Sequence, residues 1–308
     1  MHKITLGDTG LTVSPICFGC SQMGQGKWGK IPEPQLHEAV HAAIKSGINF
    51  FDTADIYGDG VAEEILGRAL KDVKRDDVVV ATKVYFRFYP DGRCHPDLSG
   101  DYIIDECEAS LKRLNLDYID LYQCHLFDKF TPLEETVEAF EKLIRQGKIR
   151  AYGASNFSVE QLRSARKVGR FNSIQPYYNL LEPKPESDLL PYCQVEHVGV
   201  LVYSPLLRGL LTGKFIGDEE FTDVRRRDSR FSGEMFKTIV NKVNKLKPVA
   251  EEKKCSVTQL SLAATIAHPA IHCAIVGIKN AEQARDAAGA MDVTIGREEY
   301  FQIRDALS

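Results

Sequence analysis

The chain has 308 residues, 44% of them hydrophobic, and its 39 lysines and arginines against 43 aspartates and glutamates give a formal net charge of −4. This mixed, slightly acidic composition is typical of a globular protein and excludes the strongly basic classes that bind nucleic acid or anionic membranes. No apolar run approaches the ~20 residues that span a bilayer, and residues 1–10 lack a signal-peptide pattern, so we expect a cytoplasmic protein without a membrane partner.

The N-terminal segment predicts a small β-hairpin, formed by residues 3–6 and 12–14 around a turn at 7–10, that plugs the floor of a barrel. After it, short apolar runs rich in Val, Ile, Phe and Tyr recur, each followed by a stretch of helical period. Because these runs are continuously apolar, we expect strands buried on both faces. The eight candidate strands are residues 16–19, 49–52, 78–82, 118–122, 149–153, 173–176, 199–203 and 273–276.

Amphipathic segments between these strands predict helices. Ser158 with Gln161 three residues on forms a capping box at the start of one helix, and Gly147 follows the end of another. The predicted helices are residues 34–46, 62–71, 102–114, 133–145 and 159–168.

The alternation of strand and helix predicts a parallel sheet with right-handed crossovers. Eight such units in a chain of this length fit a (β/α)8 TIM barrel, and an open doubly wound sheet is the alternative. No linker divides the chain, so we expect one domain over residues 1–308. The polar segment 217–233, after the seventh strand, is expected to be a functional loop on the active face. Residues 297–307 predict an extra C-terminal helix.

Two local clusters are expected to be structural. Cys17 and Cys20 have CxxC spacing but lie in an apolar strand without a second pair or nearby histidines, so we interpret them as reduced core thiols rather than a redox or metal site. The arginines at 225–227 and Arg230 are expected to form a solvated loop rather than a site for a polyanion.

In a barrel of this kind, catalytic groups come from the carboxyl ends of several strands. The polar residues at those positions are Asp52, Lys83, His125, Asn156, Gln175 and Tyr203. Tyr57 lies in the loop after Asp52. A tyrosine is a weak acid at its usual pKa near ~10, and a neighbouring cation lowers that pKa. With Lys83 as the cation and Asp52 fixing its position, we expect a lowered pKa for Tyr57 and a role as proton donor.

Asp52, Tyr57, Lys83 and His125 resemble the catalytic tetrad of the aldo-keto reductase superfamily. The matching segments are GINFFDTA at 47–54, YG at 57–58, ATK at 81–83 and DLYQCH at 120–125. The resemblance runs from the hairpin to the tail. It implies an NAD(P)H-dependent oxidoreductase that reduces a small aldehyde or ketone, or oxidises a sugar or alcohol in reverse. Tyr57 would donate the proton and His125 would orient the carbonyl.

The same resemblance assigns cofactor contacts at the ends of the later strands. They are Ser155, Asn156 and Gln175 for the nicotinamide carboxamide, Tyr203 for the ring, Ser204, Leu206 and Arg208 for the pyrophosphate, and Gly277, Lys279, Gln283 and Asp286 for the adenosine end.

The last of these motifs departs from the family pattern. Val276 and Ala281 stand where prolines are usual, and Ala287 stands where asparagine is common. Lys279 would neutralise a 2′-phosphate, which favours NADPH or NADP, with NAD as the alternative.

No Rossmann glycine motif opens a helix after a strand. The glycines of residues 19–29 are expected instead to form a flexible loop. Met23 and Trp28 of that loop are expected in the substrate pocket wall, and Trp28 has an alternative role in packing.

Two other functions remain as hypotheses. One is a catalytically slow, NADPH-binding regulatory subunit similar to potassium-channel β subunits. The other is a metal-dependent barrel hydrolase, which needs a cluster of histidines and carboxylates. Because only His125 stands at a strand end, we expect no metal.

Overall fold

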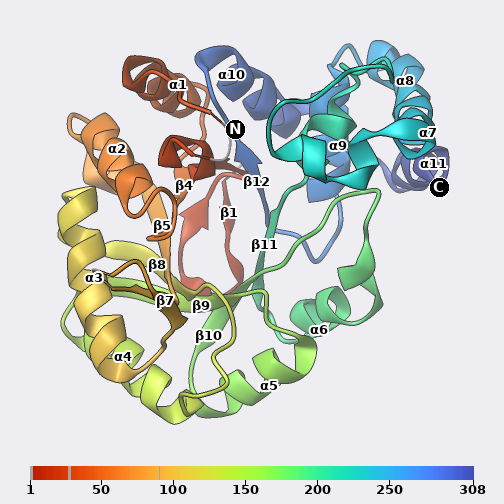
Figure 1. Cartoon of the computed structure of the whole chain (residues 1–308). Helices are drawn as coiled ribbons and strands as arrows, with labels where there is room; N and C mark the ends of the chain where they lie inside the picture. Colours follow the sequence, from red (N-terminus) through yellow and green to blue (C-terminus); the bar gives the residue numbers. More distant parts are fainter. Residues whose placement is uncertain (1–2, 27–28, 90) are drawn as a thin grey trace.

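In the computed structural model, which describes residues 3–26, 29–89 and 91–308, eight parallel strands close into a barrel (Figure 1). Each strand pairs with the next in chain order, and the last pairs with the first. The strands are β3 (Ile16–Gly19), β4 (Phe50–Asp52), β5 (Val79–Val84), β8 (Ile119–Cys124), β9 (Ile149–Ser155), β10 (Phe171–Gln175), β11 (Gly199–Tyr203) and β12 (Cys273–Gly277). The predicted (β/α)8 barrel is confirmed, and the open doubly wound sheet is wrong.

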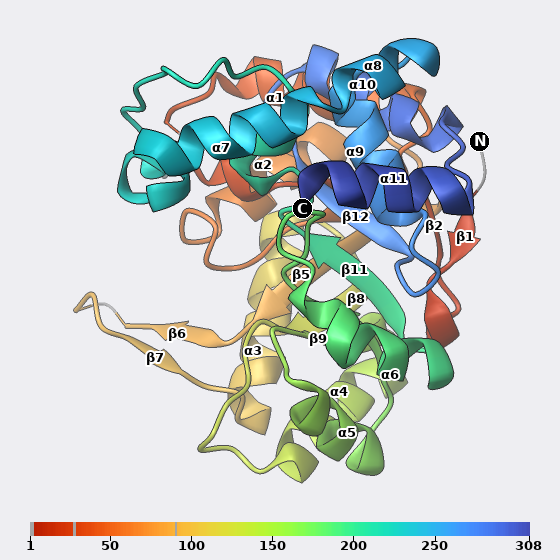
Figure 2. The same cartoon turned by 90° about the vertical axis from the view of Figure 1, so that its right-hand side faces the viewer.

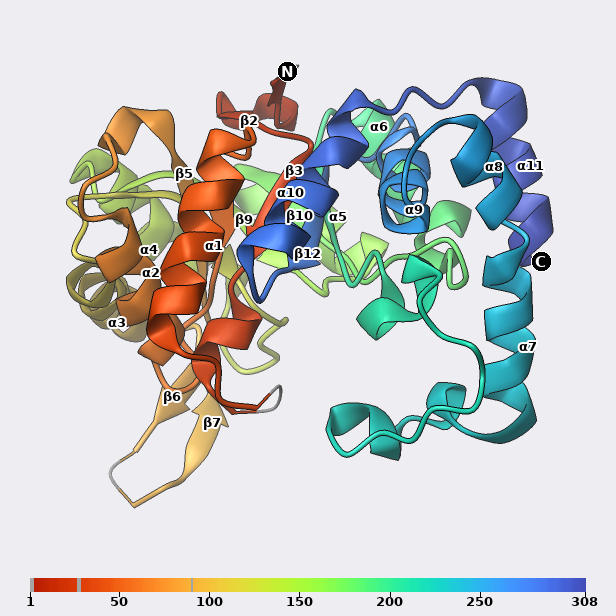
Figure 3. The ribbon, with the colours of Figure 1, turned by 90° about the horizontal axis from the view of Figure 1, so that it is seen from above.

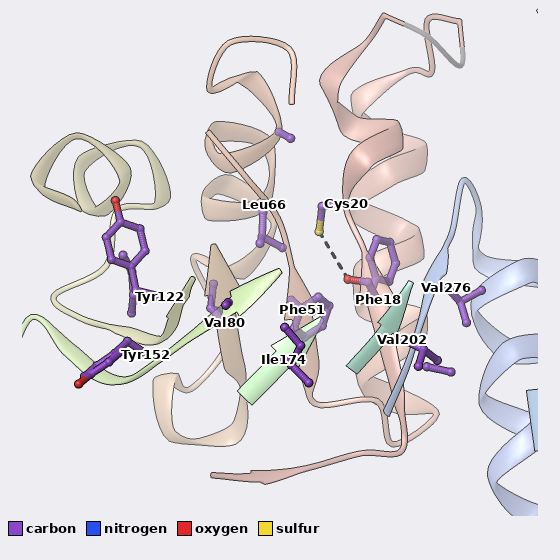
Figure 4. Packing of buried hydrophobic residues seen from close by; sticks show 14 of the residues in the cluster. Phe18, Cys20, Phe51, Leu66, Val80, Tyr122, Tyr152, Ile174, Val202 and Val276 are labelled. Atoms are coloured by element: carbon purple, nitrogen blue, oxygen red, sulfur yellow. Dashed lines mark hydrogen bonds between the residues drawn. The ribbon is translucent and has the colours of Figure 1, made fainter. Parts of the chain in front are cut away.

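Both faces of the barrel strands are buried, which explains their continuous apolar runs. In β4, Phe50 belongs to the cluster inside the barrel, whereas Phe51 packs in the layer beneath the helices. Val79 and Val80 of β5 alternate in the same way, and Figure 4 shows Phe51 and Val80 in the outer layer. Successive side chains of a strand point to opposite faces, so each strand contributes to both layers.

Eight helices follow the strands and surround the barrel (Figure 1). They are α1 (Glu33–Lys45), α2 (Val61–Leu70), α3 (Gly100–Leu114), α4 (Leu133–Arg145), α5 (Val159–Val168), α6 (Leu189–Val195), α9 (Val257–Ile266) and α10 (Ala281–Gly289). The five helices expected from the sequence are confirmed, as is the capping box of Ser158 and Gln161. Within the described residues, no helix combines the length and apolarity that crossing a membrane requires.

The N-terminal hairpin closes the floor of the barrel. Strands β1 (Ile4–Thr5) and β2 (Thr12–Val13) pair antiparallel, and the neighbouring Leu6 is fully buried in the interior cluster. The turn fits because Gly7 has no side chain: a Cβ there would lie 2.2 Å from the backbone nitrogen of Gly199, the first residue of β11. The predicted plug is confirmed.

A second hydrophobic cluster lies beside the barrel, beneath the long insertion after β11. Figures 2 and 3 show α7 (Gly233–Asn244), α8 (Lys247–Glu252) and the C-terminal α11 (Arg297–Leu307) beside the barrel. These helices pack around buried side chains such as Phe231 and Ile303. The predicted tail helix is confirmed. The segment 217–233 carries two short 3-10 turns, at Val224–Arg227 and Ser229–Phe231.

One element was not predicted. After β5, strands β6 (Phe86–Phe88) and β7 (Cys94–Pro96) form a hairpin that projects from the barrel (Figure 2). Its arms are too short to show a strand pattern, although Asp91-Gly92 is a turn signal.

Candidate active site

Asp52 and Lys83 form a buried ion pair at the carboxyl ends of β4 and β5. Asp52 is paired in register with Ala81, and Lys83 lies two residues further along the same inner face. The Lys83 Nζ donates hydrogen bonds of 2.7 Å to Oδ1 of Asp52 and of 2.7 Å to the carbonyl oxygen of Thr53. The other carboxylate oxygen accepts a bond of 2.9 Å from Nε2 of Gln175. Both charged groups are therefore buried and hydrogen-bonded within the protein.

The pair keeps Lys83 charged. Burial alone would lower the pKa of Lys83, but the carboxylate of Asp52 holds it above its usual value. The ammonium lies 5.2 Å from the centroid of the Tyr57 ring. A fixed positive charge thus faces the tyrosine.

Tyr57 is half-buried on the loop after β4. A Cβ on Gly24 would lie 2.8 Å from the carbonyl carbon of Tyr57, so this glycine allows close packing against the tyrosine loop. Burial raises the pKa of Tyr57, and the charge of Lys83 only partly offsets that rise. The expected lowering of the pKa was wrong in sign, because desolvation of the phenolate outweighs the cation. Tyr57 is consequently protonated at neutral pH.

His125 follows β8, and its backbone nitrogen donates to the carbonyl oxygen of Val84 at 3.0 Å. Its ring lies edge-on to Tyr57, with 6.1 Å between the centroids, and to Phe86, with 5.7 Å. Nδ1 is buried without a hydrogen-bond partner among the described residues. Burial, reinforced by the charge of Lys83, lowers the pKa of His125 to about 3. The imidazole is therefore neutral over the physiological range.

The ends of β9, β10 and β11 are tied together by side chains. Ser155 Oγ donates to the carbonyl oxygen of Gln175 at 2.9 Å, and Asn156 Nδ2 donates to the carbonyl oxygen of His125 at 3.1 Å. The hydroxyl of Tyr203 donates to Oδ1 of Asn156 at 2.8 Å. Asn156 has a φ of 60°, a left-handed conformation that asparagine tolerates. This conformation turns its amide back toward His125.

A cavity of about 670 Å³ runs over these groups. This volume lies within the range of ligand-binding sites. Of the residues assigned from the sequence, those that line it are Asp52, Tyr57, His125, Ser155, Asn156, Gln175, Tyr203, Ser204, Leu206, Arg208, Gly277, Lys279, Gln283 and Asp286. Lys83 is fully buried beside Asp52. The structure therefore brings the predicted tetrad and the predicted cofactor contacts to one site.

One of the two residues expected in the pocket wall, Met23, does not line the cavity. Met23 is fully buried in the outer hydrophobic layer, because its short 3-10 turn at Ser21–Gly24 packs against α2 and directs it away from the cavity. That assignment was wrong. Trp28 lies outside the described residues. Gln22 of the same turn lines the cavity instead.

The environment of the arginines at 225–227 and of Arg230 also differs from the predicted solvated loop. Arg226 and Arg227 are exposed, but Arg225 lines the cavity and Arg230 is held in ion pairs, so the expected solvated loop is wrong for these two. Sequence reasoning missed Arg225 because its approach to the cavity depends on how the whole insertion folds.

Arg225 lies near two lysines, Lys214 and Lys279, and all three line the cavity. Burial and the charge of Arg225 lower the pKa of both lysines, and Lys214 and Lys279 also repel each other. Asp223 pairs with Arg225 at 2.6 Å, and the three cations with this one carboxylate keep a net positive charge that favours an anionic ligand here.

The two cysteines of the CxxC spacing are buried free thiols, as expected. Burial raises the pKa of both, with Cys273 and Asp52 adding to the effect at Cys17. The thiols are therefore protonated and unreactive at neutral pH.

A buried carboxylate behind the site was missed by sequence reasoning. Glu63 of α2 is fully buried, accepts a hydrogen bond of 2.5 Å from Thr82 Oγ1, and pairs with Arg113 of α3 at 2.6 Å. Since Thr82 precedes Lys83, this network fixes β5 next to the lysine. Its signal in the sequence is a glutamate in a helical first turn, which does not indicate burial.

Comparisons with known proteins agree with this geometry. The protein-family model described as "Aldo/keto reductase family" matches residues 15–308. The chain is 37% identical to aldo-keto reductase YhdN of Bacillus subtilis, over 100% of this chain and 94% of the relative. It is 32% identical to an NADH-specific methylglyoxal reductase of Escherichia coli, over 99% and 98% of the two chains. A probable voltage-gated potassium channel subunit beta of Oryza sativa is 35% identical, over 95% and 92%.

Solved structures show the same similarity. A glycerol dehydrogenase from Gluconobacter oxydans superposes with a TM-score of 0.91 and 33% identity, covering 99% of this chain and 94% of that one. An aldo-keto reductase from Klebsiella pneumoniae in complex with NADPH gives a TM-score of 0.78 at 32% identity, covering 99% and 95%.

Replacing Asp52 by Asn should destabilise the protein by about 3 kcal/mol at neutral pH, because it leaves a buried ammonium without its counter-charge. In the variant the pKa of Lys83 falls in the folded state, so the deficit should shrink as the pH rises toward the unfolded value of ~10.4 and the lysine folds neutral. Urea denaturation at several pH values measures this. Glu234→Gln, which removes one partner of an exposed pair with Lys237, is the control and should change little. An Asp52→Asn variant as stable as that control would contradict the assignment.

Proposed function

We propose that this chain, which belongs to the aldo/keto reductase family and is therefore an oxidoreductase, reduces aldehydes and ketones to alcohols with NADPH, or oxidises a sugar or alcohol in the reverse direction. The observation that carries the proposal is the buried pair of Asp52 and Lys83 set beneath Tyr57 and His125 at one end of a long cavity.

The residues along the cavity fit a nicotinamide dinucleotide phosphate. The aromatic ring of Tyr203 offers a stacking surface next to the amide of Asn156. The amide nitrogen of Gln175 is used by Asp52, which leaves its Oε1 to accept from a carboxamide. At the other end, Lys214, Arg225 and Lys279 supply positive charge for phosphates. The relative named for NADH keeps NAD as the alternative cofactor.

Proton donation is the task of Tyr57. When bound, the reduced nicotinamide would supply the hydride. Tyr57 is protonated at neutral pH, so its hydroxyl has a proton to give to the carbonyl oxygen. The phenolate left behind faces the ammonium of Lys83, whose charge Asp52 maintains. Proton transfer from Tyr57 is thus favoured as negative charge develops on the carbonyl oxygen of the substrate.

His125 positions the carbonyl. Its imidazole is neutral, so it donates one hydrogen bond without competing with Tyr57 as an acid. Phe86 and Tyr57 pack edge-on against the ring and restrict its orientation. We therefore assign Tyr57 as the acid and His125 as the orienting group.

The substrate class we propose is a small carbonyl compound or the corresponding alcohol. The names of two relatives, a methylglyoxal reductase and a glycerol dehydrogenase, indicate small polar molecules. Tyr57 and His125 present polar groups at the reactive end of the cavity, which suits such substrates.

A second candidate function is a slow, cofactor-binding regulatory subunit. The likeness to the plant potassium channel subunit covers nearly the whole chain and favours this alternative. A panel of aldehydes, ketones and sugars, assayed with each nicotinamide cofactor, separates the two functions. Tight NADPH binding with very slow turnover on every compound would favour the regulatory subunit.

Tyr57→Phe should lower turnover by at least about a hundredfold, the contribution typical of a positioned general acid, because phenylalanine has no proton to give. Binding of NADPH, followed by calorimetry, should remain within about twofold, since the cofactor contacts are elsewhere. Full activity of this variant on any compound that the wild type reduces would refute the mechanism.

Lys279→Met should weaken NADPH binding by about tenfold, equal to ~1.4 kcal/mol, and leave NADH binding nearly unchanged, because only NADPH carries the 2′-phosphate. Titration of each cofactor by calorimetry gives the two dissociation constants. Lys237→Met, an exposed lysine of α7 paired with Glu234, is the matched control. Equal losses for both cofactors would contradict the assignment of Lys279 to the 2′-phosphate.

A further inference from the structure

We propose that Arg230 and Tyr177 are positioning residues that couple the 217–233 loop, at the phosphate end of the cofactor, to the Tyr203 ring at its nicotinamide end. This inference rests on the proposed function and assigns the long insertion a role beyond covering the site.

The first link is the contact between Tyr177 and Tyr203. Tyr177 follows β10 and forms a parallel bridge with Tyr203 at the end of β11. The two rings meet at an interplanar angle of 67° with centroids 5.5 Å apart. Edge-to-face packing of this kind is directional, so the position of Tyr177 restricts that of Tyr203.

The second link fixes the hydroxyl of Tyr177. This hydroxyl donates a hydrogen bond to Glu182 and accepts one of 3.0 Å from Nη1 of Arg230. The same nitrogen donates to Oε1 and Oε2 of Glu182 at 2.7 and 2.8 Å. Tyr177, Glu182 and Arg230 therefore form a closed triangle, and each member is held by the other two.

The third link reaches the loop and the cavity. The remaining guanidinium nitrogens of Arg230, Nε and Nη2, donate to Oδ1 and Oδ2 of Asp228 at 2.8 and 2.7 Å. Arg208, which lines the cavity, donates to the same Oδ2 at 3.2 Å. Arg208 has a φ of 54°, so its backbone is held in a left-handed turn that points the side chain at the loop.

The loop itself is anchored beside Arg230. Phe231 is 4% exposed and contacts Phe215, Phe221 and Phe236 in the second hydrophobic cluster. Phe221 in turn packs against the guanidinium of Arg225 at 4.5 Å, and Arg225 also lines the cavity.

These contacts form one continuous chain of side chains. It runs from Arg225 and Arg208, which face the phosphates, through the Arg230 triangle to the ring of Tyr203. A planar guanidinium that bonds two carboxylates and a phenol at once cannot be replaced by a lysine. When the 217–233 loop makes these contacts, it holds the ring of Tyr203 in the orientation that the nicotinamide requires.

The test compares Tyr177→Phe, Arg230→Gln and the double variant. Tyr177→Phe keeps the aromatic ring but loses the hydroxyl that bonds Glu182 and Arg230. Hydride transfer in a single turnover should therefore slow by on the order of tenfold, while the affinity for NADP⁺ stays within about twofold of the wild type. Arg230→Gln should slow hydride transfer and also weaken NADP⁺ binding. Because Arg230 acts on the ring through Tyr177, the two losses of rate should not add in the double variant.

Arg226→Gln, an exposed arginine of the same loop, is the control and should match the wild type in both readouts. Circular dichroism shows whether each variant folds. If Arg230→Gln does not fold, the rate of hydride transfer in Tyr177→Phe alone tests the proposal. A merely structural role would lower the melting temperature without changing the single-turnover rate of the folded variant. Hydride transfer at the wild-type rate in Tyr177→Phe would overturn the proposal.

The outcome also distinguishes this inference from the proposed function. If the wild type turns over carbonyls and the variants match it, only the coupling is refuted. If the wild type shows no turnover, the proposed function fails, and the fluorescence of bound NADPH still tests the coupling. That emission reports the environment of the ring, so it should change in Tyr177→Phe and remain constant in Arg226→Gln. An unchanged emission in Tyr177→Phe would then overturn the inference.

Discussion

The buried ion pair of Asp52 and Lys83 is the interaction on which the site depends. Removing two charges from water is costly, and the barrel compensates by giving the pair further hydrogen bonds, from Lys83 to the Thr53 carbonyl and from Gln175 to Asp52. Their placement follows from register: β4 and β5 are adjacent, and their last inward-facing residues lie above the apolar interior. Beneath them, the hairpin closes the barrel, so water is kept from the pair on that side.

Burial sets the protonation of the two titratable groups beside the pair, and the charge of Lys83 modifies it. Burial lowers the pKa of His125, an effect that Lys83 reinforces, whereas burial raises the pKa of Tyr57 and Lys83 only moderates that rise. The two groups therefore have different roles: Tyr57 carries a transferable proton at neutral pH, and His125 is neutral and restricted to hydrogen bonding. Two titratable groups side by side thus acquire different roles from their surroundings.

The sequence predicted the barrel and most of the site because both depend on local pattern. Apolar runs locate the strands, and the rule that catalytic groups stand at strand ends locates Asp52, Lys83 and His125. What it could not predict depends on contacts between distant segments. Arg225 and Arg230 meet their partners only when the insertion folds. Glu63 pairs with Arg113 only when α2 packs against α3, and Met23 is buried in the outer hydrophobic layer because of its 3-10 turn. The sign of the Tyr57 pKa shift required the depth of burial, which composition does not give.

The most direct test of the account is the pH dependence of hydride transfer to a carbonyl substrate in a single turnover, followed from about pH 6 to about pH 10.5. Reduction requires protonated Tyr57, so a raised pKa extends the active range upward. We predict a constant rate that falls only above the usual tyrosine value of ~10, with no step near the histidine value of ~6.5. A loss of rate centred below about pH 9, or a step in the histidine range, would contradict the roles given to Tyr57 and His125.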